Sequence, residues 1–167
     1  MTPEFLKALS GVLLQNLNSE TPVTSKILSA VPNEHHDYKP DPKSKTAIEL
    51  AWHIASVDIW FIDCIVGHSF QLPQREMPAD VKTGKDIAAW FDKEIAAGVP
   101  KLADMTGDQL ATTIDFYGMF NMPAAMYLQF MNNHSIHHRG QLSTYLRAMG
   151  GKCPSIYGGS ADEPMAG

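Results

Sequence analysis

The sequence has 167 residues, of which 44% are hydrophobic, and a formal net charge of −5. This length fits a single domain, here taken as residues 1–167, that is large enough to bury a core. The absence of any Lys/Arg cluster argues against nucleic-acid binding, and the absence of a long apolar run argues against a membrane span.

The N-terminal residues 1–15 predict an amphipathic helix, which begins at Thr2-Pro3-Glu4 and ends near Leu17. They lack the basic region and cleavage site of a signal peptide. The two cysteines, Cys64 in an apolar helix and Cys153 near the C-terminus, lack metal-ligand spacing and predict no disulfide framework. We therefore expect a protein of the reduced cytoplasm.

Residues 19–45 form a polar connection with four prolines. A short helix over residues 24–30 is predicted to interrupt it. His35 and His36 fall in the following loop, and adjacent loop histidines can bind a metal weakly. A solvated loop is the simpler interpretation.

A second long helix is predicted from the capping box Thr46-Ala47-Ile48-Glu49 to about Val66, with Gly67 as its end. It is apolar almost all round, which is typical of a helix that packs on several sides. His53 lies on one of its apolar faces. A lone histidine there is either a core residue satisfied by hydrogen bonds or a metal ligand.

A Pro-rich connection over residues 69–81 leads to a third long helix. A capping signal at residues 83–86 starts this helix, and it ends near Gly98 or at Ala103. Residues 106–110 predict a helical turn, and residues 112–117 a short extended segment. After Gly151 the chain has no periodicity, so we expect an irregular tail over residues 151–167.

The last long helix is predicted from Asn121, as its N-cap, to a left-handed cap at Gly150-Gly151. His134 and His138 are four residues apart and therefore share one face of it. Two neutral imidazoles on one face form half of a transition-metal site, or they pack in the core. His53 is a third histidine that could meet this pair across a helix–helix interface.

Four long helices joined by irregular connections predict an all-α four-helix bundle. The unequal connections indicate a topology other than simple up-down-up-down, although spacing alone does not fix it. No internal repeat is present in the sequence.

The sequence resembles the DinB / YfiT-like family of metal-binding four-helix bundles from the first helix to about Gly150. Two segments carry the resemblance most specifically: Trp52-His53-Ile54, and the N-H-x-x-x-H-R-G-Q run from Asn133 to Gln141. The resemblance implies three metal ligands, His53, His134 and His138. It also implies a divalent metal, usually zinc or nickel, and a homodimer.

Characterised members of the resembled family include thiol S-transferases that use bacillithiol or mycothiol, and a mycothiol-dependent maleylpyruvate isomerase. The resemblance therefore implies a low-molecular-weight thiol as a possible co-substrate. Three histidines would leave an open metal position, where a water or a thiol could ionise. We expect a thiol S-transferase acting on a small molecule. The alternatives are a metal-dependent hydrolase, a non-catalytic metal- or ligand-binding stress protein, and a bundle whose histidines only pack.

No general base is evident, because the helix reads H-S-I-H-H and lacks the glutamate of H-E-x-x-H. Glu49 is either a partner of His53 or only the capping residue, and Asp58 lies well around the helix from His53. Arg139 could attract an anionic substrate or form a surface ion pair. Gly140 in a helix interior indicates a close helix–helix approach, within the bundle or between subunits.

Overall fold

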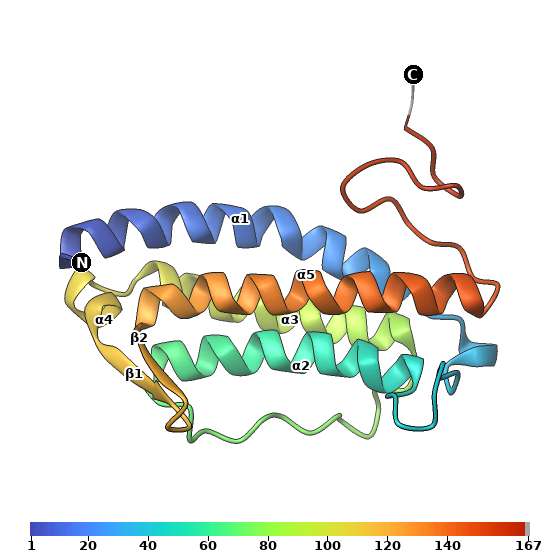
Figure 1. The fold of residues 1–167 in the computed structure, drawn as a ribbon, viewed down its shortest axis with the longest axis horizontal. Helices are drawn as coiled ribbons and strands as arrows, with labels where there is room; N and C mark the ends of the chain where they lie inside the picture. Colours follow the sequence, from blue (N-terminus) through green and yellow to red (C-terminus); the bar gives the residue numbers. More distant parts are fainter. Residues whose placement is uncertain (166–167) are drawn as a thin grey trace.

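The computed structural model describes residues 1–165, which form a bundle of four long helices (Figure 1). These helices are α1 (Pro3–Ser29), α2 (Ala47–Val66), α3 (Gly84–Ala103) and α5 (Ala124–Ala148). A short 3₁₀ helix, Asn33–His35, follows α1, and a short helix, α4 (Gly107–Ala111), follows α3. The predicted all-α four-helix bundle is confirmed.

The order of the helices around the bundle differs from their order along the chain. Both α1 and α2 pack mainly against α3 and α5, so α1 and α2 lie on opposite sides of the bundle. Figure 1 shows α1 and α5 running in one direction and α2 and α3 in the other. The connection from α2 to α3 crosses the length of the bundle, which confirms the expectation that the topology is not up-down-up-down.

Helix α1 is longer than predicted, because it continues through Pro22. The predicted end near Leu17 and the separate helix over residues 24–30 are therefore wrong. Pro22 offers no N–H to the helix, which removes the hydrogen bond that would otherwise reach the Asn18 carbonyl. The buried stripe on α1 continues on both sides of Pro22, and its packing outweighs the local cost of the proline.

Helix α2 begins and ends as the sequence predicts. The Thr46 side chain accepts from the Glu49 N–H, the Glu49 carboxylate accepts from the Thr46 N–H, and the C-cap is Gly67. Apolar side chains around the whole helix are buried, Cys64 among them. Residues on α2 therefore reach both neighbouring helices, α3 and α5.

A two-stranded antiparallel hairpin lies between α4 and α5, formed by β1 (Thr113–Phe116) and β2 (Phe120–Pro123). The extended segment expected at residues 112–117 is present, but its partner strand was not predicted. Asn121 pairs with Asp115 in this hairpin, so the prediction of Asn121 as the N-cap of the last helix is wrong. Helix α5 starts at Ala124, whose N–H donates to the Thr112 carbonyl at 2.9 Å.

The C-terminal end of α5 has the predicted left-handed cap. Gly150 has a φ of +72°, its N–H bonds the Arg147 carbonyl, and the Gly151 N–H bonds the Leu146 carbonyl. Residues 151–165 then form no helix or strand, and the last two residues of the predicted tail lie outside the described part. Within residues 1–165, no helix combines the length and apolarity needed to cross a membrane.

Candidate metal site

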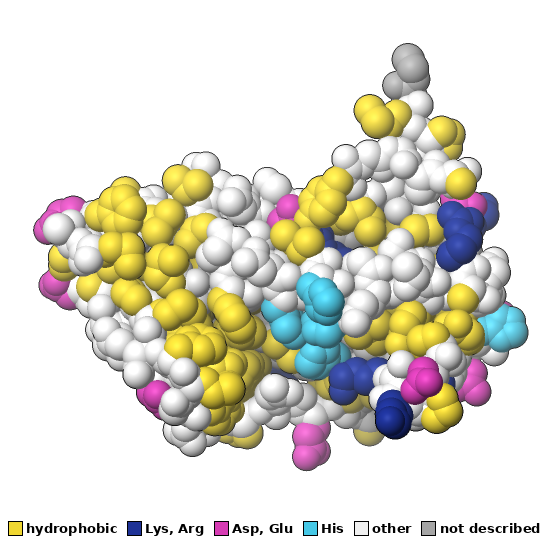
Figure 2. Space-filling view, in the orientation of Figure 1, with side chains coloured by type: hydrophobic (Ala, Val, Ile, Leu, Met, Phe, Trp, Pro, Cys, Tyr) yellow, Lys and Arg dark blue, Asp and Glu magenta, His cyan; other side chains and the backbone are white. Residues whose placement is uncertain are grey.

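Three histidines from two helices meet where α2 packs against α5. His53 projects from α2, and His134 and His138 project from successive turns of α5. The centres of their rings lie between 4.3 and 5.0 Å apart, and all three residues are partly buried. Figure 2 shows the histidine side chains gathered in the middle of one face of the molecule.

The nitrogen atoms of this trio are close enough to share an ion. The Nε2 atoms of His53 and His134 lie 3.2 Å apart, and one nitrogen from each of the three rings lies within 4.8 Å of the others. Two nitrogens bound at about 2.0–2.1 Å to one tetrahedral ion would be about 3.3 Å apart. Within residues 1–165, this is the one such cluster of His, Cys, Asp or Glu side chains.

The surroundings keep these imidazoles neutral. Burial, with smaller contributions from His138 and Lys45, lowers the pKa of His53 to about 4. Burial and the neighbouring histidines lower the pKa of His134 to about 3. The pKa of His138 is also lowered, because its burial outweighs the opposing effect of the hydrogen bond that it donates to Gln141. At neutral pH each ring therefore keeps a free nitrogen lone pair, as metal binding requires.

Gln141 orients the ring of His138, a contact that the sequence analysis missed. The His138 Nδ1 donates to the Gln141 Oε1 at 2.6 Å, which leaves the lone pair on Nε2. The spacing of three residues on a helix was the available signal. The Nδ1 of His134, by contrast, is buried without a hydrogen-bond partner among the described residues.

Asp58 lies in the core and outside the histidine cluster, in agreement with its position around α2. The Ser135 hydroxyl donates to its Oδ2 at 2.5 Å. Burial raises the pKa of Asp58 to about 7, against the opposing effects of Ser135 and Arg139. A carboxylate flanked on both sides by apolar residues of α2 was the sequence signal for this buried contact.

Arg139 is 1% exposed, so the surface ion pair considered from the sequence is instead a buried one. Its guanidinium pairs with the Glu20 carboxylate on α1 and donates to the Tyr157 hydroxyl of the tail at 2.6 Å. The Tyr157 hydroxyl in turn donates to Glu20 at 2.8 Å. These contacts direct the Arg139 charge toward α1 and the tail, and no substrate role is assigned to it.

The sequence left the roles of two further residues, Glu49 and Gly140, open between alternatives. The Glu49 carboxylate accepts from the Thr46 N–H at 2.7 Å, which is its capping role. A Cβ at Gly140 would meet no atom within 4 Å, so the close approach expected within the bundle is wrong. A close approach between subunits stays a prediction.

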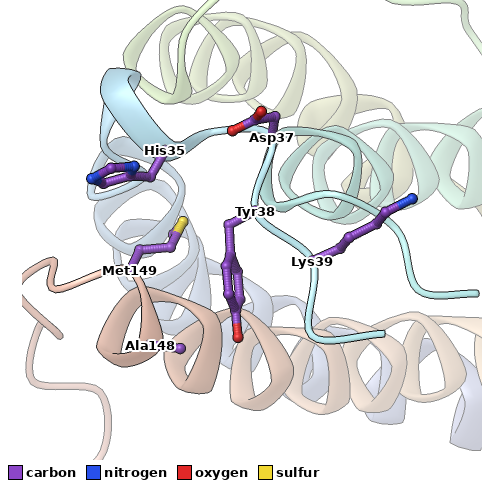
Figure 3. Close-up of a pocket in the computed structure, with 6 residues that line it drawn as sticks. All are labelled: His35, Asp37, Tyr38, Lys39, Ala148 and Met149. Atoms are coloured by element: carbon purple, nitrogen blue, oxygen red, sulfur yellow. The ribbon is translucent and has the colours of Figure 1, made fainter. Parts of the chain in front are cut away.

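His35 and His36 lie away from the histidine trio, beside the C-terminal end of α5. His35 lines a cavity of about 450 Å³ with Tyr38, Lys39 and Met149. Figure 3 shows the side chain of Lys39 pointing away from that of His35. Neither histidine belongs to a potential metal cluster in the part of the chain described.

Comparison with known proteins decides the family. The sequence model of the DinB family matches residues 4–165. The chain belongs to the DinB family. Two similar relatives come from Bacillus subtilis strain 168: the uncharacterized protein YrdA, 28% identical over 151 residues, and the uncharacterized protein YjoA, 29% identical over 146 residues. These matches cover 90% and 84% of this chain and 89% and 91% of the relatives.

Solved structures of DinB-like proteins share the fold of this DinB-family member. The Bacillus subtilis protein YjoA superposes with a TM-score of 0.70 at 27% identity, covering 86% of this chain and 96% of its own. A DinB-like protein from Bacillus cereus ATCC 10987 gives a TM-score of 0.72 at 32% identity, covering 87% and 95%. The family resemblance and the bundle predicted from the sequence are both confirmed.

Proposed function

We propose that this DinB-family protein holds a divalent metal ion, zinc or nickel, between His53, His134 and His138. The observation that carries the proposal is the convergence of three neutral imidazoles from two separate helices. Three protein ligands leave a position open, which is typical of catalytic zinc sites, whereas structural zinc has four protein ligands.

The proposed reaction is the transfer of a low-molecular-weight thiol to a small electrophile. An ion at the site would lower the pKa of a thiol bound in the open position. The thiol proton would pass to solvent, and the new sulfur–carbon bond would form as the leaving group departs from the electrophile. No carboxylate belongs to the cluster within residues 1–165, so none is positioned there as a base. The protein partly buries the three imidazole rings, and Gln141 fixes the orientation of the His138 ring.

Two alternatives use the same three histidines. A metal-bound water, with its pKa lowered to about 7, would make the protein a hydrolase. A metal or small ligand held without turnover would make it a binding protein of a stress response. A fourth possibility, that the histidines only pack, requires that no metal binds.

We also propose a homodimer in the cytoplasm. Phe5 and Val12, seven residues apart on one face of α1, are 53% and 55% exposed. Gly140 on α5 leaves its side of the helix open. Both observations support a surface that a second copy could cover. The free thiols of Cys64 and Cys153 support a reducing compartment.

Metal analysis of purified protein tests the site first. We expect about one zinc or nickel per chain in the wild type, a loss in His53→Ala, and no change in the control His35→Ala. Unchanged metal in His53→Ala would remove His53 from the site. Turnover of monochlorobimane with a panel of thiols then tests the transferase. Ester or amide cleavage without any thiol reaction would favour the hydrolase.

A further inference from the structure

On one face of the molecule, the histidine trio is flanked by two ends that differ in chemistry. Figure 2 shows hydrophobic side chains on one side of the central histidines and Lys/Arg side chains on the other. The apolar end lies toward the β-hairpin, and the basic end lies toward the start of α2. A ligand that reaches the histidines over this face therefore meets both ends.

An aromatic platform, defined as Phe116, Phe120 and Phe130, forms the apolar end. Phe130 lies one turn before His134 on α5 and is 38% exposed. The centre of its ring lies 5.7 Å from that of Phe116 and 5.8 Å from that of Phe120. The centre of the buried Phe61 ring lies 5.7 Å from that of Phe130 and 6.3 Å from that of His134, so the platform and the histidine trio pack against the same core side chain.

A basic pocket of about 370 Å³, which His53 helps to line, forms the other end. Lys43 and Lys45 line it, both are exposed, and neither has an ion-pair partner within residues 1–165. Lys45 and His53 line the same pocket, so the basic end borders the histidine trio directly.

The other charged groups of this pocket already have partners. The Glu49 carboxylate accepts from the Thr46 N–H, and Arg75 pairs with Asp63 and Glu94. The side chains that line the pocket include three cations, Lys43, Lys45 and Arg75, and one carboxylate, Glu49, so an excess of positive charge faces the pocket.

The backbone of Lys45 is held in place. Its carbonyl accepts from the Tyr145 hydroxyl of α5 at 3.4 Å, and the next residue, Thr46, is the N-cap of α2. Lys45 therefore bridges the two helices that carry the histidines.

We propose that the ligand of this site is a small amphiphilic organic anion, with an apolar ring on the aromatic platform and its anionic group at Lys43 and Lys45. Its middle then lies at the three histidines. Phe130 and His138 are eight residues apart, about 12 Å along a helix, so the ligand must be at least about this long to reach past the histidines. The inference names a substrate class for the site. It rests on the proposed function for the reaction, but its test measures binding alone, which needs no turnover.

Isothermal titration calorimetry with the full chain tests the inference, using 6-phenylhexanoate, its neutral analogue 6-phenylhexanol, and ringless hexanoate. We expect 6-phenylhexanoate to bind at least about tenfold more tightly than either analogue. Its affinity falls as salt rises, because the charges are solvent-accessible, whereas that of 6-phenylhexanol does not.

Two variants separate the contributions of the aromatic platform and of the basic pocket. Lys45→Gln weakens 6-phenylhexanoate about fivefold and leaves 6-phenylhexanol unchanged. Phe130→Ala weakens both ring compounds about tenfold. Lys85→Gln, which alters an exposed lysine on α3, is the control and changes neither.

The results that overturn the inference differ from those that overturn the proposed function. Equal binding of the acid and the alcohol, or no effect of Lys45→Gln, removes the basic end. Absence of binding, together with a change of oligomeric state in Phe130→Ala, shows that a second copy covers the platform, which also overturns the inference. Metal content is measured on the same samples. A metal-free wild type that still discriminates ring and charge overturns only the metal-dependent function.

Discussion

The Nε2 atoms of His53 and His134 lie 3.2 Å apart, although 81 positions separate the two residues in the sequence. One N–H···N hydrogen bond between neutral rings satisfies this distance, and so does a shared metal ion. A bound ion would link α2 to α5 at the point where the hydrogen bond joins the same two helices.

Removing the metal is expected to destabilise the folded chain. An ion present at about 100 times its dissociation constant adds about 2.7 kcal/mol to the free energy of unfolding. For a chain of this size, that corresponds to a rise in Tm of about 5–10 °C. Thermal unfolding of chelator-treated protein, with and without added zinc, measures the shift. His134→Ala should abolish it, and a zinc-induced shift of equal size in that variant would contradict the site.

Gln141→Leu is expected to weaken metal binding about 10- to 100-fold, because the leucine cannot accept the His138 Nδ1–H. Competition with a chromogenic chelator measures the affinity. Gln129→Leu is a matched control on the same helix, since Gln129 bonds Asn133 and no ligand histidine. Equal affinities in the two variants would show that Gln141 does not orient the site.

The buried carboxyl of Asp58 is expected to lower the free energy of unfolding as pH rises. Burial raises its folded pKa to about 7, whereas an unfolded carboxyl titrates near 3.9. Between these values the unfolded chain releases a proton that the folded chain retains, so folding stability contributed by this group falls with rising pH. Asp58→Asn removes the effect and should gain about 3–4 kcal/mol over the wild type between about pH 4 and pH 8. Urea unfolding across this range measures it, and parallel pH profiles would refute it.

Arg139→Ala is expected to destabilise the fold by about 3–5 kcal/mol, because it leaves the Glu20 carboxylate without its buried partner. Arg147 lies on the same helix as Arg139 and forms a more exposed pair with Asp162 of the tail. Arg147→Ala should therefore cost less than about 1 kcal/mol. Chemical denaturation of both variants compares them. Similar losses in the two would mean that burial of Arg139 adds nothing to its ion pair.

Alanine substitutions at two helical glycines are expected to have opposite effects on stability. At Gly84 a Cβ would lie 2.4 Å from the Leu28 carbonyl oxygen, so Gly84→Ala should cost about 1–3 kcal/mol. At Gly140 a Cβ meets no atom within 4 Å, so Gly140→Ala should stabilise the chain by about 0.5–1 kcal/mol.

Thermal unfolding measures both glycine variants, and sedimentation measures their oligomeric state. A destabilised Gly140→Ala with unchanged assembly would contradict the second expectation. A shift toward monomer would support the proposed close approach between subunits.

Local chemistry in the sequence determined much of the fold. The capping boxes at Thr46 and Thr83 fix the starts of α2 and α3, and Gly150 fixes the end of α5. The spacing of His134 and His138 places both on one helical face. These features could be predicted because each depends on residues within about one helical turn of each other.

Contacts between distant segments decided the rest. Packing of α1 carries that helix through Pro22, and pairing with β1 takes Asn121 out of α5. The order of the helices around the bundle brings α2 against α5, so that His53 meets the α5 pair, and turns Arg139 toward Glu20 on α1. Such contacts follow from the burial of whole helix faces, a free energy that no single turn of the chain contains.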